Sequence, residues 1–213
     1  MTGKKQTRFD DIYKDMSLDE VPWNLETPPE LLVELVDTGK VRPCKAIDLG
    51  CGAGNYVVYL AARGFDVTGV DFSPTAIKIA KENAKTKGVK CNFLVADVLD
   101  QLGDIDQTWD FAYGWGLLHH IFPEQRQKYV ENVYRILNPK GKYLSLCFSE
   151  KDTGFEGSGK YRKTDIGSVI YFSSEDELRK LFETHFQIID LRTVQISGRF
   201  ESHIFNYVLM EKM

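Results

Sequence analysis

The sequence contains no apolar run long enough to cross a membrane, and it has no strong excess of charge of one sign. Its first residues, MTGKKQTRFDDIYK, are polar and of mixed charge, so they lack the apolar core of a secretory signal. The formal net charge of −4 argues against a nucleic-acid partner, which usually binds through a basic surface. We therefore expect a cytoplasmic protein with no membrane partner.

Cysteine is also scarce, and its spacing excludes two classes of small domain. Cys44, Cys51, Cys91 and Cys147 are far apart and form no CxxC pair. Zinc ribbons and disulfide frameworks need paired cysteines, so neither is expected, and we predict no metal site. Each cysteine is expected to be a small buried side chain in a reducing compartment.

What the sequence does contain is a regular alternation of strand and helix patterns over 213 residues, 43% of them apolar. Thr27 to Glu30 resembles a capping box that begins one helix, and Ser73 is predicted to be the N-cap of another. This alternation predicts an α/β fold, a Rossmann-like parallel sheet with helices on both faces. Short apolar runs typical of buried strands occupy 45–50, 65–71, 91–97, 108–115 and 142–149.

The C-terminal part departs from this alternation. Two long strand patterns, 186–196 and 203–210, are separated only by SGRFES. Because a parallel crossover needs a much longer connection, we predict a C-terminal antiparallel β-hairpin.

Gly50, Gly52 and Gly54 lie between the first strand pattern and a helix pattern, in AIDLGCGAGN. Glycines let a backbone turn lie close to a ligand. Their spacing is GxGxG, whereas pyrophosphate-binding turns have GxGxxG. A second glycine segment, GFEGSGK, matches GxxxxGK, but Tyr161 follows where a phosphate-binding loop has Ser or Thr. We therefore expect residues 151–168 to form a mobile, partly basic loop and not an ATP site.

Three acids lie at or near the carboxyl ends of the first three predicted strands. Asp48 precedes the glycines, Asp71 ends the second strand, and Asp97 ends the third. Open α/β sheets bind their ligands at this edge, and an acid at the position of Asp71 is suited to bind ribose hydroxyls. Acids beside a turn of this kind indicate a nucleoside that carries positive charge and no phosphate.

The segments DLGCGAG, GVDFS and VADVL resemble the first three motifs of class I S-adenosylmethionine-dependent methyltransferases, over residues 45 to about 149. The resemblance implies S-adenosylmethionine as cofactor, with Asp48 and the glycine loop at its amino-acid end, Asp71 at the ribose, and Asp97 with Val98 beside the adenine. The complete set of cofactor-binding residues that it implies is Trp23, Asp48, Gly50, Gly52, Gly54, Asn55, Asp71, Phe72, Asp97, Val98 and Gly114.

The methyl acceptor is expected to enter past the fourth strand, at AYGWGLLHH. Tyr113 and Trp115 share a face by strand alternation, so both are candidates to line the acceptor pocket, although one of them is expected to belong to the core. Trp115 and His119 are weak catalytic candidates, and His119 is also a candidate substrate contact. We assign His120 a structural role, because the same segment is widespread in the superfamily.

The segment VPWNLETPP is similar to the N-terminal segment of thiol, halide and thiopurine methyltransferases. That similarity implies that Trp23 lies against the cofactor and that the first helix, with Tyr13, covers the site. Members of that group methylate soft, anionic nucleophiles. Equally, Trp23 is suited to anchor the N-terminal helix to the sheet.

We therefore predict transfer of a methyl group to a small molecule, with a thiol or another soft nucleophile as the leading acceptor. The alternatives are an O- or N-methyltransferase of a metabolite, an RNA or protein methyltransferase using Lys151, Lys160, Arg162 and Lys163, an NAD(P)-dependent reductase, and a binding module without turnover. The chain is assigned to one methyltransferase domain, 1–213. Its predicted parts are a helical lid (1–40), a cofactor-binding core (45–149), and a substrate loop, helix and antiparallel strands (150–213).

Overall fold

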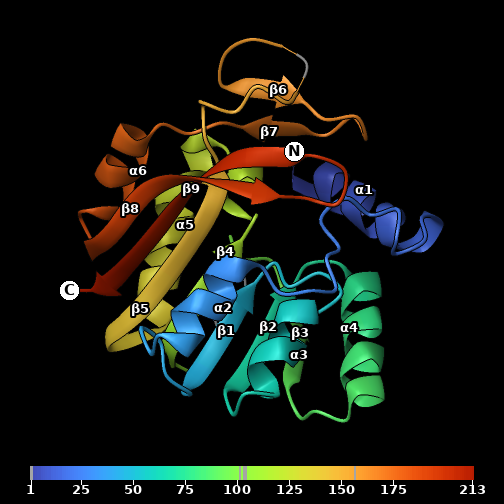
Figure 1. The fold of residues 1–213 in the computed structure, drawn as a ribbon, viewed down its shortest axis with the longest axis vertical. Coiled ribbons are helices and arrows are strands. Elements are labelled where there is room, and N and C mark those ends of the chain that lie inside the picture. The colour runs from blue at the N-terminus through green and yellow to red at the C-terminus, as the bar shows by residue number, and fades with distance from the viewer. Residues whose placement is uncertain (1, 101, 103–104, 156) are drawn as a thin grey trace.

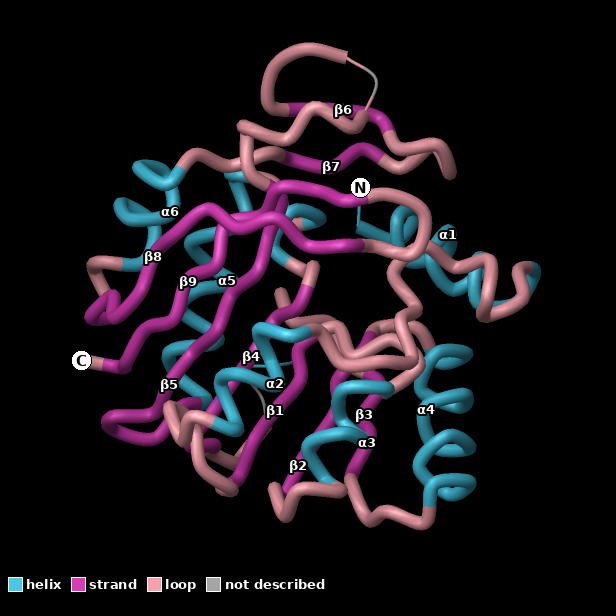
Figure 2. The backbone as a smooth tube through the Cα atoms, in the orientation of Figure 1, coloured by secondary structure: helices cyan, strands magenta, loops and turns pink. Residues whose placement is uncertain are grey.

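A seven-stranded sheet runs through the computed structural model, which describes residues 2–100, 102, 105–155 and 157–213 (Figures 1 and 2). The strand order is β3-β2-β1-β4-β5-β9-β8. The first five of these strands are parallel, which confirms the Rossmann-like arrangement. Their bounds are β1 (Lys45–Leu49), β2 (Asp66–Asp71), β3 (Asn92–Val95), β4 (Trp109–Trp115) and β5 (Leu137–Phe148).

The last two strands of the chain form the predicted antiparallel hairpin. β8 (Phe186–Ser197) pairs with β9 (Ser202–Lys212), and β9 pairs antiparallel with β5. The hairpin therefore extends the sheet beyond its parallel part and brings the turn between β8 and β9 to the edge where the parallel strands end.

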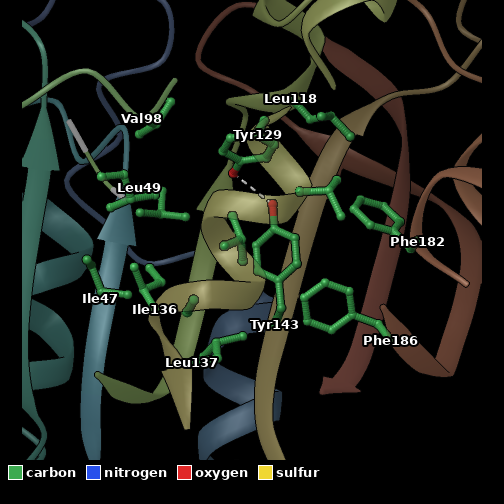
Figure 3. Packing of buried hydrophobic residues seen from close by; sticks show 14 of the residues in the cluster. Ile47, Leu49, Val98, Leu118, Tyr129, Ile136, Leu137, Tyr143, Phe182 and Phe186 are labelled. Carbon is green, nitrogen blue, oxygen red and sulfur yellow. Dashed lines mark hydrogen bonds between the residues drawn. The ribbon is translucent and has the colours of Figure 1, made fainter. Parts of the chain in front are cut away.

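Helices cover both faces of the sheet (Figure 1). On one face α2 (Glu30–Asp37), α3 (Asn55–Ala61) and α4 (Pro74–Lys87) contribute to one apolar cluster. On the other face α5 (Pro123–Ile136) and α6 (Glu175–Phe182) contribute to a second cluster. Figure 3 shows part of this second cluster, where the hydroxyls of Tyr129 and Tyr143 form a hydrogen bond of 2.8 Å. That bond satisfies two polar groups that would otherwise be buried without partners.

The N-terminal helix α1 (Thr2–Asp15) lies at the edge of the molecule and is tied to the start of α4. The Asp10 carboxylate accepts hydrogen bonds from the Ser73 hydroxyl (2.7 Å) and the Thr75 amide (3.1 Å). Ser73 is the N-cap of α4, as predicted, and its side chain accepts from the Ala76 amide. A negative side chain at a helix N-terminus is favourable, so this contact fixes α1 above the glycine turn.

The stretch 151–168, which we expected to be a mobile loop, contains a short strand. β6 (Tyr161–Lys163) and β7 (Val169–Tyr171) form a small antiparallel sheet next to the 3-10 helix η2 (Leu118–His120), beyond the ends of the parallel strands. This β6–β7 hairpin is joined to the main sheet through the Ser173 amide, which donates to the Phe148 carbonyl. Among the described residues, no helix is both long and apolar enough to cross a bilayer.

Candidate active site

A cavity of about 400 Å³ opens at the carboxyl ends of the parallel strands. Its walls come from five parts of the chain: the N-terminal segment at 9–25, the glycine turn with the strand ends, the η2 region, residues 155 and 164–170, and the segment 196–205. Most of the lining is apolar. The carboxylates Asp48 and Asp71 lie toward the glycine turn, and aromatic side chains and histidines lie toward η2 and β9.

The glycine turn approaches the N-terminal helix closely. Gly50 (φ +78°) and Gly52 (φ +51°) both line the cavity with backbone conformations that favour glycine. A Cβ on Gly52 would lie 2.4 Å from the Tyr13 hydroxyl oxygen, so a larger residue there displaces Tyr13. Gly54 is outside the cavity lining. A Cβ at Gly54 would meet Ala80 at 2.8 Å, so this glycine permits close packing of α3 against α4.

Asp71 is buried and shapes the turn. Its carboxylate accepts hydrogen bonds from the Gly52 amide (3.0 Å) and the Ser73 amide (2.9 Å). Burial raises the pKa of Asp71 above its ordinary value, and the two backbone hydrogen bonds oppose that rise. Asp71 and its neighbour Phe72 both line the cavity.

Asp48 is the second buried acid of the cavity. Burial raises the pKa of Asp48 to about 8, the nearby Tyr113 hydroxyl opposes part of the rise, and Asp71 adds to it. Arg199 is the one Lys or Arg among the described lining residues, so this end of the cavity has a strongly acidic character. Buried carboxylates of this kind favour a ligand that brings its own positive charge and hydroxyl groups.

Asn55 begins α3 and connects the turn to the N-terminal segment. Its side-chain amide donates to the Asn24 side-chain oxygen (2.8 Å) and to the Leu25 carbonyl (3.1 Å), and its own oxygen accepts from Asn83 (2.9 Å). Asn24 also lines the cavity. The sequence analysis did not identify Asn24, because nothing in its local pattern points to a partner so far along the chain.

Trp23 and Tyr13 meet over the cavity. The Trp23 indole N–H donates to the Tyr13 hydroxyl at 2.8 Å, and the Phe9 ring lies 5.6 Å from the Trp23 ring. Trp23 is 37% exposed. The two interpretations of Trp23 are therefore compatible, since it both lines the cavity and holds α1 in place.

Besides Gly54, three further predicted site residues lie outside the cavity lining. Asp97 accepts a hydrogen bond from the Leu99 amide in the turn after β3, while its neighbour Val98 lines the cavity. A Cβ on Gly114 would meet the Tyr129 and Tyr143 hydroxyls, so this position packs against the core. Tyr113 is fully buried, with its ring stacked on Phe111, and is therefore the core member of the Tyr113 and Trp115 pair.

Trp115 and His119 do line the cavity. The His119 ring is buried, and its Nδ1 has no hydrogen-bond partner among the described residues. Burial lowers the pKa of His119 well below its ordinary value, and His120 and Arg126 add to that effect. His119 therefore stays neutral at physiological pH and is a poor proton acceptor.

The main omission of the sequence analysis is the turn between β8 and β9. Residues 196–201 with His203 and Phe205 form one wall of the cavity, and Arg199 donates to the Asn24 carbonyl at 2.6 Å. The hairpin itself was predicted, but the sequence contains no signal that places its turn over the ends of distant parallel strands.

Residues 46–141 match a family model described as a methyltransferase domain. A carboxy-S-adenosyl-L-methionine synthase of Campylobacter jejuni is 32% identical over 88% of this chain and 89% of that protein. A 2-heptyl-1-hydroxyquinolin-4(1H)-one methyltransferase of Mycobacteroides abscessus is 27% identical over 92% of this chain and 83% of that protein.

A tRNA N(3)-methylcytidine methyltransferase of Drosophila melanogaster is 30% identical, but the match covers only 53% of its length. That relative weakens the expectation that nucleic acid is not a partner. A solved structure from work on the conversion of a disulfide bond into a thioacetal group during echinomycin biosynthesis superposes with a TM-score of 0.81, at 24% identity, over 97% of this chain and 92% of that chain. The N-terminal similarity to thiol, halide and thiopurine methyltransferases is not specifically supported by these matches. The family match, the full-length relatives and the shared fold together place this chain among the class I S-adenosylmethionine-dependent methyltransferases.

Proposed function

We propose that this protein transfers a methyl group from S-adenosylmethionine to a small, largely apolar aromatic molecule, through a thiol or ring-bound hydroxyl of that acceptor. The observation that carries the proposal is the continuity of the cavity. One end is acidic and lies on the glycine turn, and the other end is built from aromatic rings. Both ends belong to the same cavity, so cofactor and acceptor can bind in it side by side.

The acidic end fits the cofactor by the chemistry of its donors. S-adenosylmethionine supplies an activated methyl group on a sulfonium, together with an ammonium and ribose hydroxyls. Asp48 is positioned for the ammonium, Asp71 for the ribose, and Val98 with Phe72 for apolar contact with the base. Trp23 and Tyr13 cover this end and exclude water from it.

The opposite end fits an aromatic acceptor. Phe148 stacks with Phe205 at 4.4 Å between ring centroids, Phe155 lies at a right angle to Phe148, and Ile170 completes the wall. Rings in these arrangements favour a flat apolar ligand. The Mycobacteroides abscessus relative is named for an acceptor of this kind, a hydroxylated quinolone.

A large nucleic-acid substrate is less well supported by this chain. Of the four basic residues considered for RNA, Lys151 pairs with Glu175, Lys160 pairs with Glu150 and Glu177, and Arg162 donates to backbone carbonyls. Three of the four cations are thus engaged within the protein and Lys163 is exposed, so these residues supply little of the basic surface that phosphates need.

A second candidate function is the one named in the Campylobacter jejuni relatives, synthesis of carboxy-S-adenosylmethionine. One observation favours it: Arg199 lies at the cavity with an Nε that makes no hydrogen bond to any described residue. A guanidinium there is suited to pair with an additional carboxylate.

The experiment combines binding with product analysis. The protein is first titrated calorimetrically with S-adenosylmethionine, S-adenosylhomocysteine and NADH, and is then incubated with S-adenosylmethionine and a panel of aromatic thiols, phenols and hydroxyquinolones. Mass spectrometry should show S-adenosylhomocysteine and an acceptor heavier by one methylene. Turnover of tRNA or of non-aromatic thiols only, or a carboxylated cofactor as product, would contradict the proposal.

A further inference from the structure

A histidine that the sequence analysis did not consider lines the acceptor end of the cavity. His203 is the second residue of β9. Its Nδ1 lies 3.3 Å from Oδ2 of Asp152, a residue that follows β5. Asp152 is 3% exposed, and its carboxylate also accepts hydrogen bonds from the Ile204 amide (2.6 Å) and the Gly154 amide (2.9 Å). A carboxylate held by two backbone amides is fixed in orientation.

This arrangement determines how the imidazole is presented. Because a carboxylate only accepts hydrogen bonds, Nδ1 of His203 is the donor in its pair with Asp152, and Nε2 is the ring nitrogen left to accept a proton. The Phe155 ring stacks on the imidazole at 4.7 Å with an interplanar angle of 7°, and a Cβ on Gly154 would lie 2.9 Å from the ring. Gly154 and Phe155 belong to the GxxxxGK segment, so the start of this segment packs against the histidine.

We propose that His203 is the general base of the acceptor reaction and that Asp152 is its positioning residue. This inference rests on the proposed function, because it concerns an acceptor whose hydroxyl, thiol or ring N–H must lose a proton to become nucleophilic. Two features favour His203 over His119, the earlier candidate. His203 has a buried acidic partner, whereas His119 has none among the described residues. The half-exposed Glu201 carboxylate, 3.4 Å from Nε2, can accept a hydrogen bond from Nε2–H after the proton has been transferred.

The step balances without a further reactant. The acceptor O–H, S–H or N–H bond breaks as its proton passes to Nε2 of His203, and the acceptor heteroatom bonds the methyl carbon. The methyl–sulfur bonding pair stays on sulfur, which becomes neutral, and the proton later passes from His203 to water. Among the described residues, the titratable groups that face His203 are Asp152, 3.3 Å from Nδ1, Glu201, 3.4 Å from Nε2, and His119.

The test uses the full-length protein with S-adenosylhomocysteine and a chromogenic phenol, such as a nitrophenol, whose ionised form absorbs at longer wavelength. Absorbance is followed as a function of pH for the wild type, His203→Gln, Asp152→Asn and His119→Gln. In the wild type the bound phenol should ionise at lower pH than in water, because its proton moves to His203. In His203→Gln this shift should be lost, in Asp152→Asn reduced, and in His119→Gln retained.

Turnover gives the second measurement. For acceptors that are neutral at the assay pH, His203→Gln should lower kcat by about 100-fold or more, the usual contribution of a general base, and should leave kcat for already ionised acceptors nearly unchanged. His185→Gln, on the remote side of the molecule against Tyr134, is the matched control. Equal losses for both acceptor classes, or an unchanged phenol pKa in His203→Gln, would overturn the inference. Absence of phenol binding to the wild type would instead contradict the proposed function.

Discussion

Asp71 is the residue on which the geometry of the cofactor site depends most directly. Its carboxylate already orients the Gly52 and Ser73 amides and faces the cavity. We expect Asp71→Asn to weaken S-adenosylmethionine binding by about 1–3 kcal/mol, because charge-assisted hydrogen bonds to the ribose are lost. Calorimetric titration measures the change. Asp66→Asn, at the exposed opposite end of β2, is the control, and an equal affinity in both variants would remove Asp71 from the site.

The raised pKa of Asp48 predicts that the stability of the cofactor-free protein depends on pH. Burial raises the pKa of Asp48 to about 8, well above its value in an unfolded chain. The group therefore favours the folded state most below the unfolded pKa, and this contribution is lost as pH rises toward about 8. Asp48→Asn should gain melting temperature relative to the wild type between pH 5 and pH 8. A difference that stays constant over this range would show that Asp48 is ionised in the fold.

At the scale of single residues, the sequence predicted the acids and glycines that line the cavity beside the glycine turn. It missed most of the residues at the aromatic end of the cavity, where we propose that the acceptor binds. Asp48, Gly52 and Asp71 follow from motif spacing and from the rule that strand ends converge. Alternation put Tyr113 and Trp115 on one face but did not show which of them belongs to the core, because it does not give the depth of a strand residue in the molecule. His203 and Asp152 were missed because their pairing depends on how β9 lies beside β5, which no local pattern encodes.

Between elements, α1 and the glycine turn form a contact that can be measured. Gly52→Ala would place a Cβ 2.4 Å from the Tyr13 hydroxyl and would also strain a positive φ. We expect it to destabilise the protein and to weaken cofactor binding. Tyr13→Phe in the same chain should recover part of the loss, since it removes the clashing oxygen, while the strain remains.

A double-mutant cycle isolates this coupling, which we expect to be about 0.5–3 kcal/mol for groups in direct contact. The free energies of unfolding are measured for the wild type, the two single variants and the double variant. Strict additivity would mean that α1 moves away from the turn without cost.

The elements themselves were largely predictable, and the errors have local causes. Ser73 caps α4 as its pattern indicates. By contrast, α2 begins at Glu30 and its N-cap is Pro29, with no side-chain cap bond, so the capping box at Thr27 to Glu30 was wrong. The expected loop at 151–168 contains β6, because pairing with β7 overrides a sequence rich in Gly and charge. β5 begins before Pro139, at Leu137, where the chain leaves α5 in an extended conformation.

For the whole molecule, the cavity is closed by segments from opposite ends of the chain. Arg199 in the β8–β9 turn donates to the Asn24 carbonyl, and Asn24 is held in turn by Asn55 at the start of α3. Neither segment covers the cavity alone, and neither is buried in one of the two main apolar clusters. Segments that contribute no buried residue to the main clusters are expected to open at lower free-energy cost than the core, so this closure is expected to respond to ligand.

Binding of S-adenosylhomocysteine should therefore reduce amide hydrogen exchange in a defined pattern. We expect protection at 9–25, at the glycine turn 50–55 and at 196–201, because a ligand in the cavity contacts all three and selects the closed arrangement. Residues 61–66, from the end of α3 to the start of β2, lie away from the cavity and are the internal control. Arg199→Gln should retain protection at the glycine turn but lose it at 9–25 and 196–201, because the bond to Asn24 is weakened. Protection confined to the glycine turn in the wild type would show that the N-terminal segment and the β8–β9 turn are fixed before the ligand binds.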